Sequence, residues 1–247
     1  LLDALEVYLE QKGKGRPKTF RVAAERSCNY LIGLCGNKPL SDYTRQDALQ
    51  FRDWLVDRGL TGSSVTRNFS YLKAVINFAL SEYALDVRNP FIGVYHDRNA
   101  GVLVRKPIPI DDIRNIQSEC RAINDDMRWL IALISDTGMR LAEGAGLLKQ
   151  DFIGLDTDLQ YVRIIKHPWR NLKTASRERR IPLVGEALWA AKRILKIDNG
   201  SDFAFPRYNR TPPTAANSAS AALNKWLKWA FEESLSVLRN PTTCYNH

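Results

Sequence analysis

The segment DTGMRLAEGAGLLKQDF, residues 136–152, has the residue types and the spacing of a phosphate-binding site. Arg140 directly follows a Thr-Gly turn at the expected start of a helix. From a helix N-terminus its guanidinium can grip a phosphate through two parallel hydrogen bonds. The alternative interpretation is a surface arginine paired with Glu143 or Asp136. Glu143 itself is expected to brace a neighbouring group by hydrogen bonding rather than to act as a general base.

A second chemical signal is the basic stretch at residues 160–183. Its cations are accompanied by one acidic residue, Glu178, and the whole chain has a formal net charge of +9. Such a local positive field favours a polyanionic partner, most commonly nucleic acid. The cations are Arg163, Lys166, Arg170, Lys173, Arg177, Arg179 and Arg180.

Other chemistries find little support in the sequence. No GxGxxG or GxxxxGK[ST] loop is present, so a bound nucleotide has no support. His96, His167 and His247 form no metal-binding spacing, and the first two are expected to be solvated loop residues. The cysteines form no CxxC pair, which favours reduced core thiols over a metal site or a disulfide framework. They are Cys28, Cys35, Cys120 and Cys244.

Periodicity and turn residues predict two mainly helical domains. Residues 1–95 form the first, with four helices at about 1–12, 20–36, 44–59 and 61–88. A linker at 96–108 contains Gly101 and Pro107. Residues 109–247 form the second, with helices at 110–122, 125–136 and 140–148, strands at 160–166 and 178–183 forming a hairpin with a basic tip, and helices at 184–197 and 214–234. The predicted class is mainly α with a small β-hairpin or sheet.

The segment around Arg140 resembles the first arginine box of the tyrosine recombinases, the phage-integrase family. The matching residues are Thr137, Gly138, Arg140, Glu143, Leu147, Asp151 and Phe152. LKTASRERRIPL, residues 172–183, resembles the β-hairpin lysine box of that family, and FAFP at 203–206 resembles a phrase that precedes its next helix. The four N-terminal helices are similar to the family's core-binding domain, so the resemblance covers nearly the whole chain.

This resemblance implies a site-specific DNA recombinase that cleaves and rejoins strands through a 3′-phosphotyrosyl intermediate, for a phage or mobile element. Arg140 would neutralise the phosphate, and Lys173 would donate a proton to the departing 5′ oxygen. Lys166 is the competing candidate for that lysine, because hairpin lengths vary. The mechanism requires no metal and no other cofactor. Recombinases of this family act on double-stranded DNA attachment sites as homo-tetramers, some with DNA-bending accessory proteins.

The sequence departs from the family pattern near its end. The family has an H-x-x-R box, which His247 would open unless Tyr245 occupies that position, and then a tyrosine nucleophile. No tyrosine present stands in the nucleophile's place, so residues 1–247 alone are expected to bind DNA without recombining it. One alternative is a catalytically incomplete DNA-binding remnant or regulator with the same clamp fold. Another is a relative of the type IB topoisomerases, disfavoured by the helical N-terminal domain.

Several cations are predicted to contact DNA, mainly at backbone phosphates that position rather than specify. Among the tryptophans, Trp169 is the one considered for a DNA contact. No run of about 18 apolar residues is present, so no membrane span is expected, and the resemblance implies a location in the bacterial cytoplasm and nucleoid. The predicted DNA-binding residues are Arg45, Arg67, Lys73, Lys166, Arg170, Arg177 and Arg179.

Overall fold

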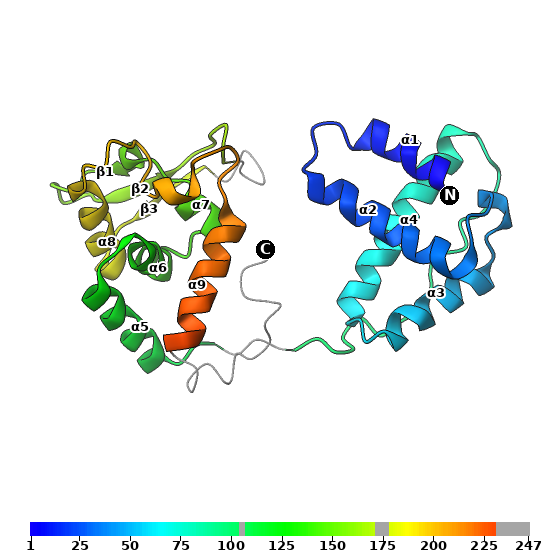
Figure 1. Cartoon of the computed structure of the whole chain (residues 1–247), viewed down its shortest axis with the longest axis horizontal. Coiled ribbons are helices and arrows are strands. Elements are labelled where there is room, and N and C mark those ends of the chain that lie inside the picture. Colours follow the sequence, from blue (N-terminus) through cyan, green and yellow to red (C-terminus); the bar gives the residue numbers. More distant parts are fainter. Residues whose placement is uncertain (104–106, 171–177, 231–247) are drawn as a thin grey trace. The chain divides into compact units, whose positions relative to one another are not determined.

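The computed structural model describes residues 1–103, 107–170 and 178–230 of the chain (Figure 1). The chain divides into two compact units, Leu1–Val104 (unit 1) and Arg105–His247 (unit 2), and each has its own hydrophobic core. Among the described residues, no helix combines the length and the apolar character needed to span a membrane.

Unit 1 contains the four predicted helices. Their core is apolar, with Phe51, Leu72 and Ile76 almost fully buried at helical spacing. The longest helix, α4, packs against both α1 and α2. A short 3₁₀ turn at Leu40–Asp42 joins α2 to α3. The helices are α1 Leu2–Lys12, α2 Lys18–Cys35, α3 Arg45–Asp57 and α4 Gly62–Glu82.

The start of α3 is fixed by a Thr-x-x-Asp capping box. The Asp47 backbone N–H donates to the Thr44 hydroxyl at 3.2 Å, and the Thr44 N–H donates back to the Asp47 carboxylate at 2.8 Å. These two bonds satisfy amides that a helix N-terminus leaves without intrahelical partners. Asp47 also accepts from the Lys38 ammonium at 2.9 Å, so the cap ties α3 to the preceding loop.

Unit 2 combines five helices and a three-stranded antiparallel sheet in its described part, which confirms the predicted fold class. The strand order is β1-β2-β3. The β2–β3 pair is the predicted hairpin, and its register places Ile164 opposite Arg179. The helices are α5 Ile110–Ile123, α6 Asp126–Thr137, α7 Leu141–Ala145, α8 Gly185–Lys196 and α9 Ala216–Ala230, and the strands are β1 Phe152–Ile153, β2 Tyr161–Ile164 and β3 Arg179–Pro182.

Two details of unit 2 differ from the sequence prediction. The helix expected at 140–148 ends at Ala145, because the chain turns at Gly146 and enters a 3₁₀ turn at Lys149–Asp151. Strand β1 was not predicted, since its two residues are too few to show a period. The shorter helix brings Asp151 back toward α7.

The turn before Arg140 is anchored to α8. The Asp136 carboxylate, at the end of α6, accepts from the backbone N–H groups of Glu186 at 2.7 Å and Ala187 at 3.3 Å. Gly185, the residue before Glu186, has a φ of +50°, and a Cβ there would approach the Asp136 carboxylate to 2.7 Å. Asp136 therefore caps a helix distant in sequence and fixes the chain just ahead of residues 137–140.

The described cysteines are free thiols. Cys28 and Cys120 lie in the cores of units 1 and 2, and Cys35 is partly buried. Burial raises the pKa of both core thiols to about 12. Cys28 and Cys120 are thus inert core residues, as the sequence predicts.

Candidate functional site

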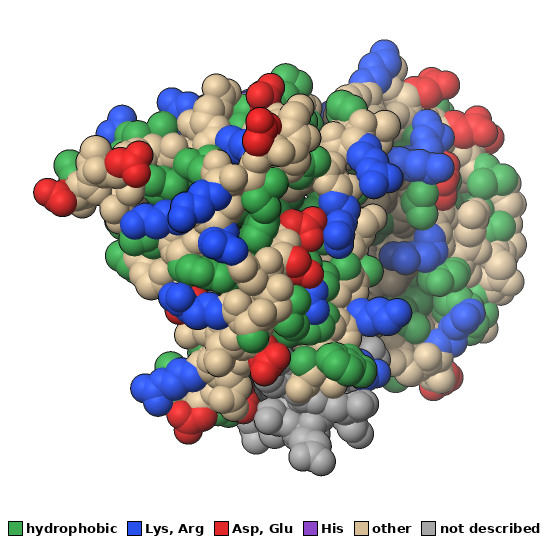
Figure 2. Space-filling view, turned by 60° about the vertical axis from the view of Figure 1, so that its left-hand side comes forward, with side chains coloured by type: hydrophobic (Ala, Val, Ile, Leu, Met, Phe, Trp, Pro, Cys, Tyr) green, Lys and Arg blue, Asp and Glu red, His purple; other side chains and the backbone are tan. Residues whose placement is uncertain are grey.

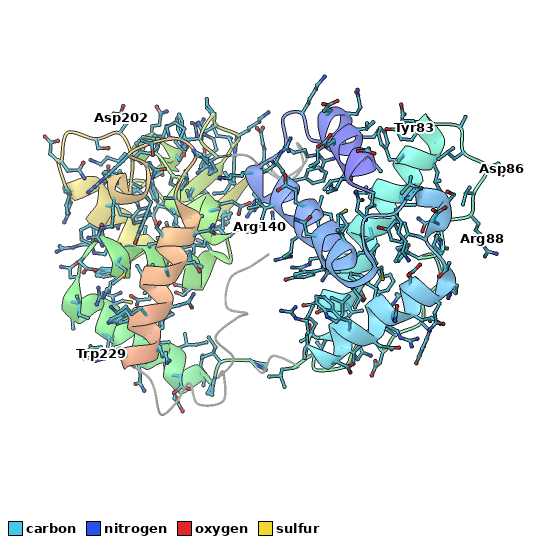
Figure 3. All side chains as sticks on the ribbon, turned by 45° about the vertical axis from the view of Figure 1, so that its right-hand side comes forward. Tyr83, Asp86, Arg88, Arg140, Asp202 and Trp229 are labelled. Atoms are coloured by element: carbon cyan, nitrogen blue, oxygen red, sulfur yellow. The ribbon has the colours of Figure 1, made fainter. Side chains whose placement is uncertain are left out.

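Arg140 begins helix α7 directly after a left-handed turn. Gly138 ends α6 with φ +60° and donates to the Ile134 carbonyl oxygen at 3.0 Å, and Met139 is buried behind it. Arg140 then has an extended backbone, and 36% of its side chain is exposed. It lies where α7 begins, and α7 packs against α9 (Figure 3). This conformation presents the guanidinium at a helix N-terminus, as the sequence predicts.

Glu143 lies on the inner side of Arg140 and is 3% exposed. Its Oε2 accepts from the Arg140 backbone N–H at 2.9 Å and from Arg179 Nη2 at 2.8 Å. Burial by itself raises the pKa of Glu143, but the hydrogen bonds from Arg179 and Arg140 outweigh it and hold that pKa below its usual value. Glu143 is therefore an ionised acceptor, and its predicted bracing role is confirmed.

Arg170 is the buried cation of the site. Its side chain is 1% exposed, and it donates to the backbone oxygens of Glu143 at 2.9 Å and of Ile165 at 2.8 Å. Its Nη2 lies 3.6 Å from the fully buried carboxylate of Asp151. The prediction that Arg170 contacts DNA is wrong, because a guanidinium enclosed in this way has no surface to offer a phosphate. It joins the end of β2 to α7 instead.

His167 and Trp169 pack beside Arg170. Their rings stack at 4.6 Å between centroids, His167 Nε2 lies 3.5 Å from the Asp151 carboxylate, and the Trp169 indole N–H donates to the Gly146 carbonyl oxygen at 3.1 Å. Burial and the Arg170 charge lower the pKa of His167. The expectation of a solvated His167 is wrong, and the Trp169 indole binds its own chain rather than being free to stack on a base.

The other described histidine is also packed rather than solvated. His96 Nε2 lies 2.7 Å from the Thr66 hydroxyl, and its ring stacks on Phe69 at 6.0 Å. From its polar neighbours in the sequence, His96 looks like a solvated loop residue. Its packing partners, Thr66 and Phe69, lie in α4, about 30 residues earlier in the chain. The expectation for His96 is corrected accordingly.

The predicted DNA-binding cations of unit 1 differ in whether their side chains already bind groups of the protein. The Arg45 guanidinium is exposed, yet it donates to three backbone oxygens of the segment 90–93 at 2.7–2.9 Å and so holds that loop. Arg67 is exposed and Lys73 is partly exposed, and neither forms an ion pair within the part of the chain that the structure describes. Lys and Arg side chains are spread over the visible face of the molecule rather than gathered in one patch (Figure 2).

The predicted hairpin residues are only partly within the description. Lys166 is exposed just after β2, and its backbone N–H donates to Glu178 at 3.3 Å. Arg179 is partly exposed and binds Glu143. The remaining candidates, Lys173, Arg177, Tyr245 and His247, lie outside the described residues. Among residues 1–103, 107–170 and 178–230, no group of three or more His, Cys, Asp or Glu side chains could hold a metal ion.

The fold and the Arg140 box together define a tyrosine recombinase. The family model described as "Phage integrase family" matches residues 108–238, more than half of the chain, and the chain belongs to this family. No curated protein matches the sequence.

Three solved structures have a similar fold. A fragment of the Tn1549 transposon integrase in complex with circular intermediate DNA has 20% identity and a TM-score of 0.73, covering 97% of this chain and 82% of that one. A lambda integrase dimer bound to a COC' core site has 17% identity and a TM-score of 0.68, covering 92% and 77%. A lambda integrase tetramer bound to a Holliday junction has 17% identity and a TM-score of 0.67, covering 92% and 65%.

Proposed function

We propose that this chain belongs to a site-specific DNA recombinase that breaks and rejoins strands through a 3′-phosphotyrosyl intermediate, in the integration or excision of a phage or mobile element. The observation that carries this proposal is the arrangement at Arg140. Its guanidinium is partly exposed at a helix start, while the neighbouring carboxylate of Glu143 is engaged by a second arginine. Family membership and the fold shared with the Tn1549 and lambda integrases support it.

Arg140 acts on the phosphate that is attacked. When a tyrosine hydroxyl attacks phosphorus and the 5′ oxygen departs, the non-bridging oxygens gain negative charge in the transition state. A guanidinium donates two parallel hydrogen bonds to such oxygens and stabilises the transition state more than the ground state. Glu143 contributes by binding the backbone N–H of Arg140, which fixes the point from which the side chain extends.

Lys173 is our proposed proton donor to the departing 5′ oxygen, on the strength of the hairpin motif. Protonation makes that oxygen a better leaving group, and the phosphodiester bond energy is retained in the phosphotyrosine link. Rejoining then reverses the step, with a 5′ hydroxyl as the nucleophile. No ATP is consumed in this scheme.

We further propose that the partner is double-stranded DNA and that four copies assemble on it. The lambda integrase of similar fold was solved as a dimer and as a tetramer on DNA. Of the cations that the sequence predicts to contact DNA, Arg67 and Lys166 are exposed and Lys73 is partly exposed, so each can reach a backbone phosphate. Such contacts position the protein and make its affinity depend on salt.

Binding is tested by selection from a pool of random duplexes, followed by affinity measurements on the selected duplex at several salt concentrations. Arg140→Met is expected to weaken binding about tenfold, through loss of one charge-assisted contact, and to lower the salt slope by about one unit. Arg114→Met is the matched control, because Arg114 lies in the same unit, is 71% exposed and pairs only with Asp111 among the described residues. An unenriched pool, or equal affinities for the two variants, would overturn the proposal.

Cleavage is tested with a nicked duplex that traps the covalent adduct, using the form of the protein that carries its tyrosine nucleophile. Arg140→Met should reduce the rate of adduct formation by about a hundredfold or more, as expected for a lost transition-state donor. Arg114→Met should leave the rate unchanged. Equal rates for the two variants would contradict the role of Arg140 in the chemistry.

A further inference from the structure

We infer that Arg179 is a positioning residue: it occupies the carboxylate of Glu143 and so keeps the Arg140 guanidinium available for a phosphate. This inference rests on the proposed function of Arg140. It replaces the prediction from sequence that Arg179 contacts DNA with a role inside the protein. The two roles make different predictions for double variants.

The distances show which arginine the carboxylate binds. Arg179 Nη2 lies 2.8 Å from Glu143 Oε2, and Arg179 Nη1 lies 3.4 Å from Oε1, so Arg179 engages both oxygens. Arg140 Nη1 lies 3.9 Å from Oε1, beyond hydrogen-bonding distance. Glu143 thus hydrogen-bonds to the backbone N–H of Arg140, whereas the Arg140 guanidinium stays at the outer limit of ion-pair distance with no hydrogen bond to the carboxylate.

The identity of the arginine that pairs with Glu143 is important because the Glu143 carboxylate is buried. The Glu143 side chain is 5% exposed, whereas those of Arg140 and Arg179 are 36% and 37% exposed. A buried carboxylate requires a cation, because an uncompensated buried charge is strongly destabilising. Two arginines around one carboxylate leave one net positive charge, which is what an incoming phosphate requires. Without Arg179, the nearest side-chain cation on Glu143 is Arg140, and pairing them would leave no net charge.

The surrounding structure offers no substitute for Arg179 among the described residues. Arg170 approaches Glu143 only at its backbone oxygen and has Asp151 as its own carboxylate partner. The sheet register explains why Arg179 points inward, since it lies opposite Ile164, which is fully buried. The next residue, Arg180, lies opposite Arg163 and has its guanidinium over the Tyr161 ring at 5.4 Å.

The test compares DNA affinity and salt slope among Arg179→Met, Arg140→Met and the double variant, on the duplex selected for the wild-type chain. If Arg179 acts through Arg140, Arg179→Met should weaken binding about tenfold and lower the salt slope by about one unit, as Arg140→Met does. The double variant should bind no more weakly than Arg140→Met alone. Arg180→Met, a variant of the neighbouring exposed arginine, is the control for loss of a charge.

A second variant separates positioning from direct contact. Glu143→Gln keeps an acceptor for the Arg140 N–H but removes the charge that would capture its guanidinium. Adding Glu143→Gln to Arg179→Met should restore affinity to within about twofold of wild type, and Arg179→Lys should retain most of it. Thermal unfolding followed by circular dichroism checks folding, and if Arg179→Met does not fold, the Arg179→Lys and Glu143→Gln/Arg179→Met chains still give the comparison.

The experiment distinguishes failure of the Arg179 inference from failure of the proposed function. Additive losses in the Arg140/Arg179 double variant, with no rescue by Glu143→Gln, would show that Arg179 binds DNA directly and would overturn this inference alone. An Arg140→Met chain that binds like wild type would overturn both this inference and the proposed function.

Discussion

The two units bury different kinds of polar side chain. In the described part of unit 1 three of the four buried polar groups are neutral, such as Ser27, whose hydroxyl donates to Asn68 at 2.9 Å, and the one charged group, Asp47, caps α3 and pairs with Lys38. In the described part of unit 2 they are all charged and belong to one network around α7. The buried polar residues are Ser27, Asp47, Asn68 and Asn89 in unit 1, and Glu143, Asp151 and Arg170 in unit 2.

This difference indicates that the buried charges of unit 2 serve a purpose other than stability. Burying ions costs desolvation free energy that their mutual attraction offsets only in good geometry, so a buried ionic network is poor evidence of stability. Replacing buried ion pairs by well-packed apolar residues of similar volume is often neutral or stabilising. The network in unit 2 lies directly behind Arg140, where the direction of one guanidinium matters, and we attribute its retention to positioning rather than to stability.

The largest expected effect comes from opening the apolar core of unit 1. Phe51 is fully buried and its ring lies 5.4 Å from that of Phe69. Phe51→Ala should lower the free energy of unfolding by about 4 kcal/mol, through lost burial and a residual cavity. Hydrogen exchange should rise in peptides from residues 1–103 and stay unchanged in those from 107–230. Val56→Ala, at a half-exposed position of the same helix, should change stability by about 0.5 kcal/mol or less.

The next effect tests the charged network of unit 2. Arg170→Met should destabilise unit 2 by about 3 kcal/mol, because it leaves the Asp151 carboxylate buried without its enclosed cation. Arg163→Met is the matched control: its guanidinium lies 4.0 Å from the same carboxylate but is 41% exposed, so the loss should be below about 1 kcal/mol. Equal losses in urea unfolding would contradict the contrast between buried and exposed pairs.

The same network marks the limit of what the sequence could predict. The helices, the Thr44 capping box and the Arg140 turn were predictable because their signals are local: apolar spacing, turn residues and side chains three positions apart. The burial of Arg170 was not, because nothing in its neighbourhood distinguishes it from Lys166, which is exposed. Its partners are backbone oxygens and a carboxylate brought near only by the fold.

Arg179 illustrates the same limit at the candidate site. The sequence predicts a DNA contact for Arg179 because the segment is basic, but composition does not show where a side chain points. The register of β3 with β2 decides to which face of the sheet the Arg179 side chain points, and that register is not visible in the composition of the segment. The motif drew attention to Arg179, and the structure shows its guanidinium bound to Glu143.

A smaller loss of stability is expected when the helix cap at Thr44 in unit 1 is removed. Thr44→Ala should destabilise unit 1 by about 1 kcal/mol, because the α3 N-terminus loses the hydroxyl that accepts the Asp47 N–H. Thr19→Ala, an exposed threonine within α2, is the control and should leave the unfolding midpoint unchanged. A Thr44→Ala chain as stable as the control would show that the cap is dispensable.

The smallest expected effect is a difference in pH dependence between the units. Burial raises the pKa of Asp47, but hydrogen bonds from Thr44 and Lys38 outweigh it and lower the pKa to about 2 from 3.8. A carboxyl with a lowered folded-state pKa stabilises the fold above its unfolded value and loses that contribution as the pH falls through the folded one. The Asp47 contribution to unit 1 should therefore persist at pH 5 and disappear between about pH 4 and pH 2.

In unit 2 the corresponding loss should begin near neutral pH, because of His167. Burial and the charges of Arg170 and Arg163 lower its pKa below 6.5, and Asp151 only partly opposes them. Below pH 6.5 the unfolded chain then binds more protons than the folded one, so unit 2 loses stability as the pH falls. Urea unfolding followed by tryptophan fluorescence reports mainly on unit 2, since Trp54 is the only tryptophan before residue 105. His167→Gln should flatten this dependence between pH 7 and pH 5, and an unchanged slope would show that another group controls it.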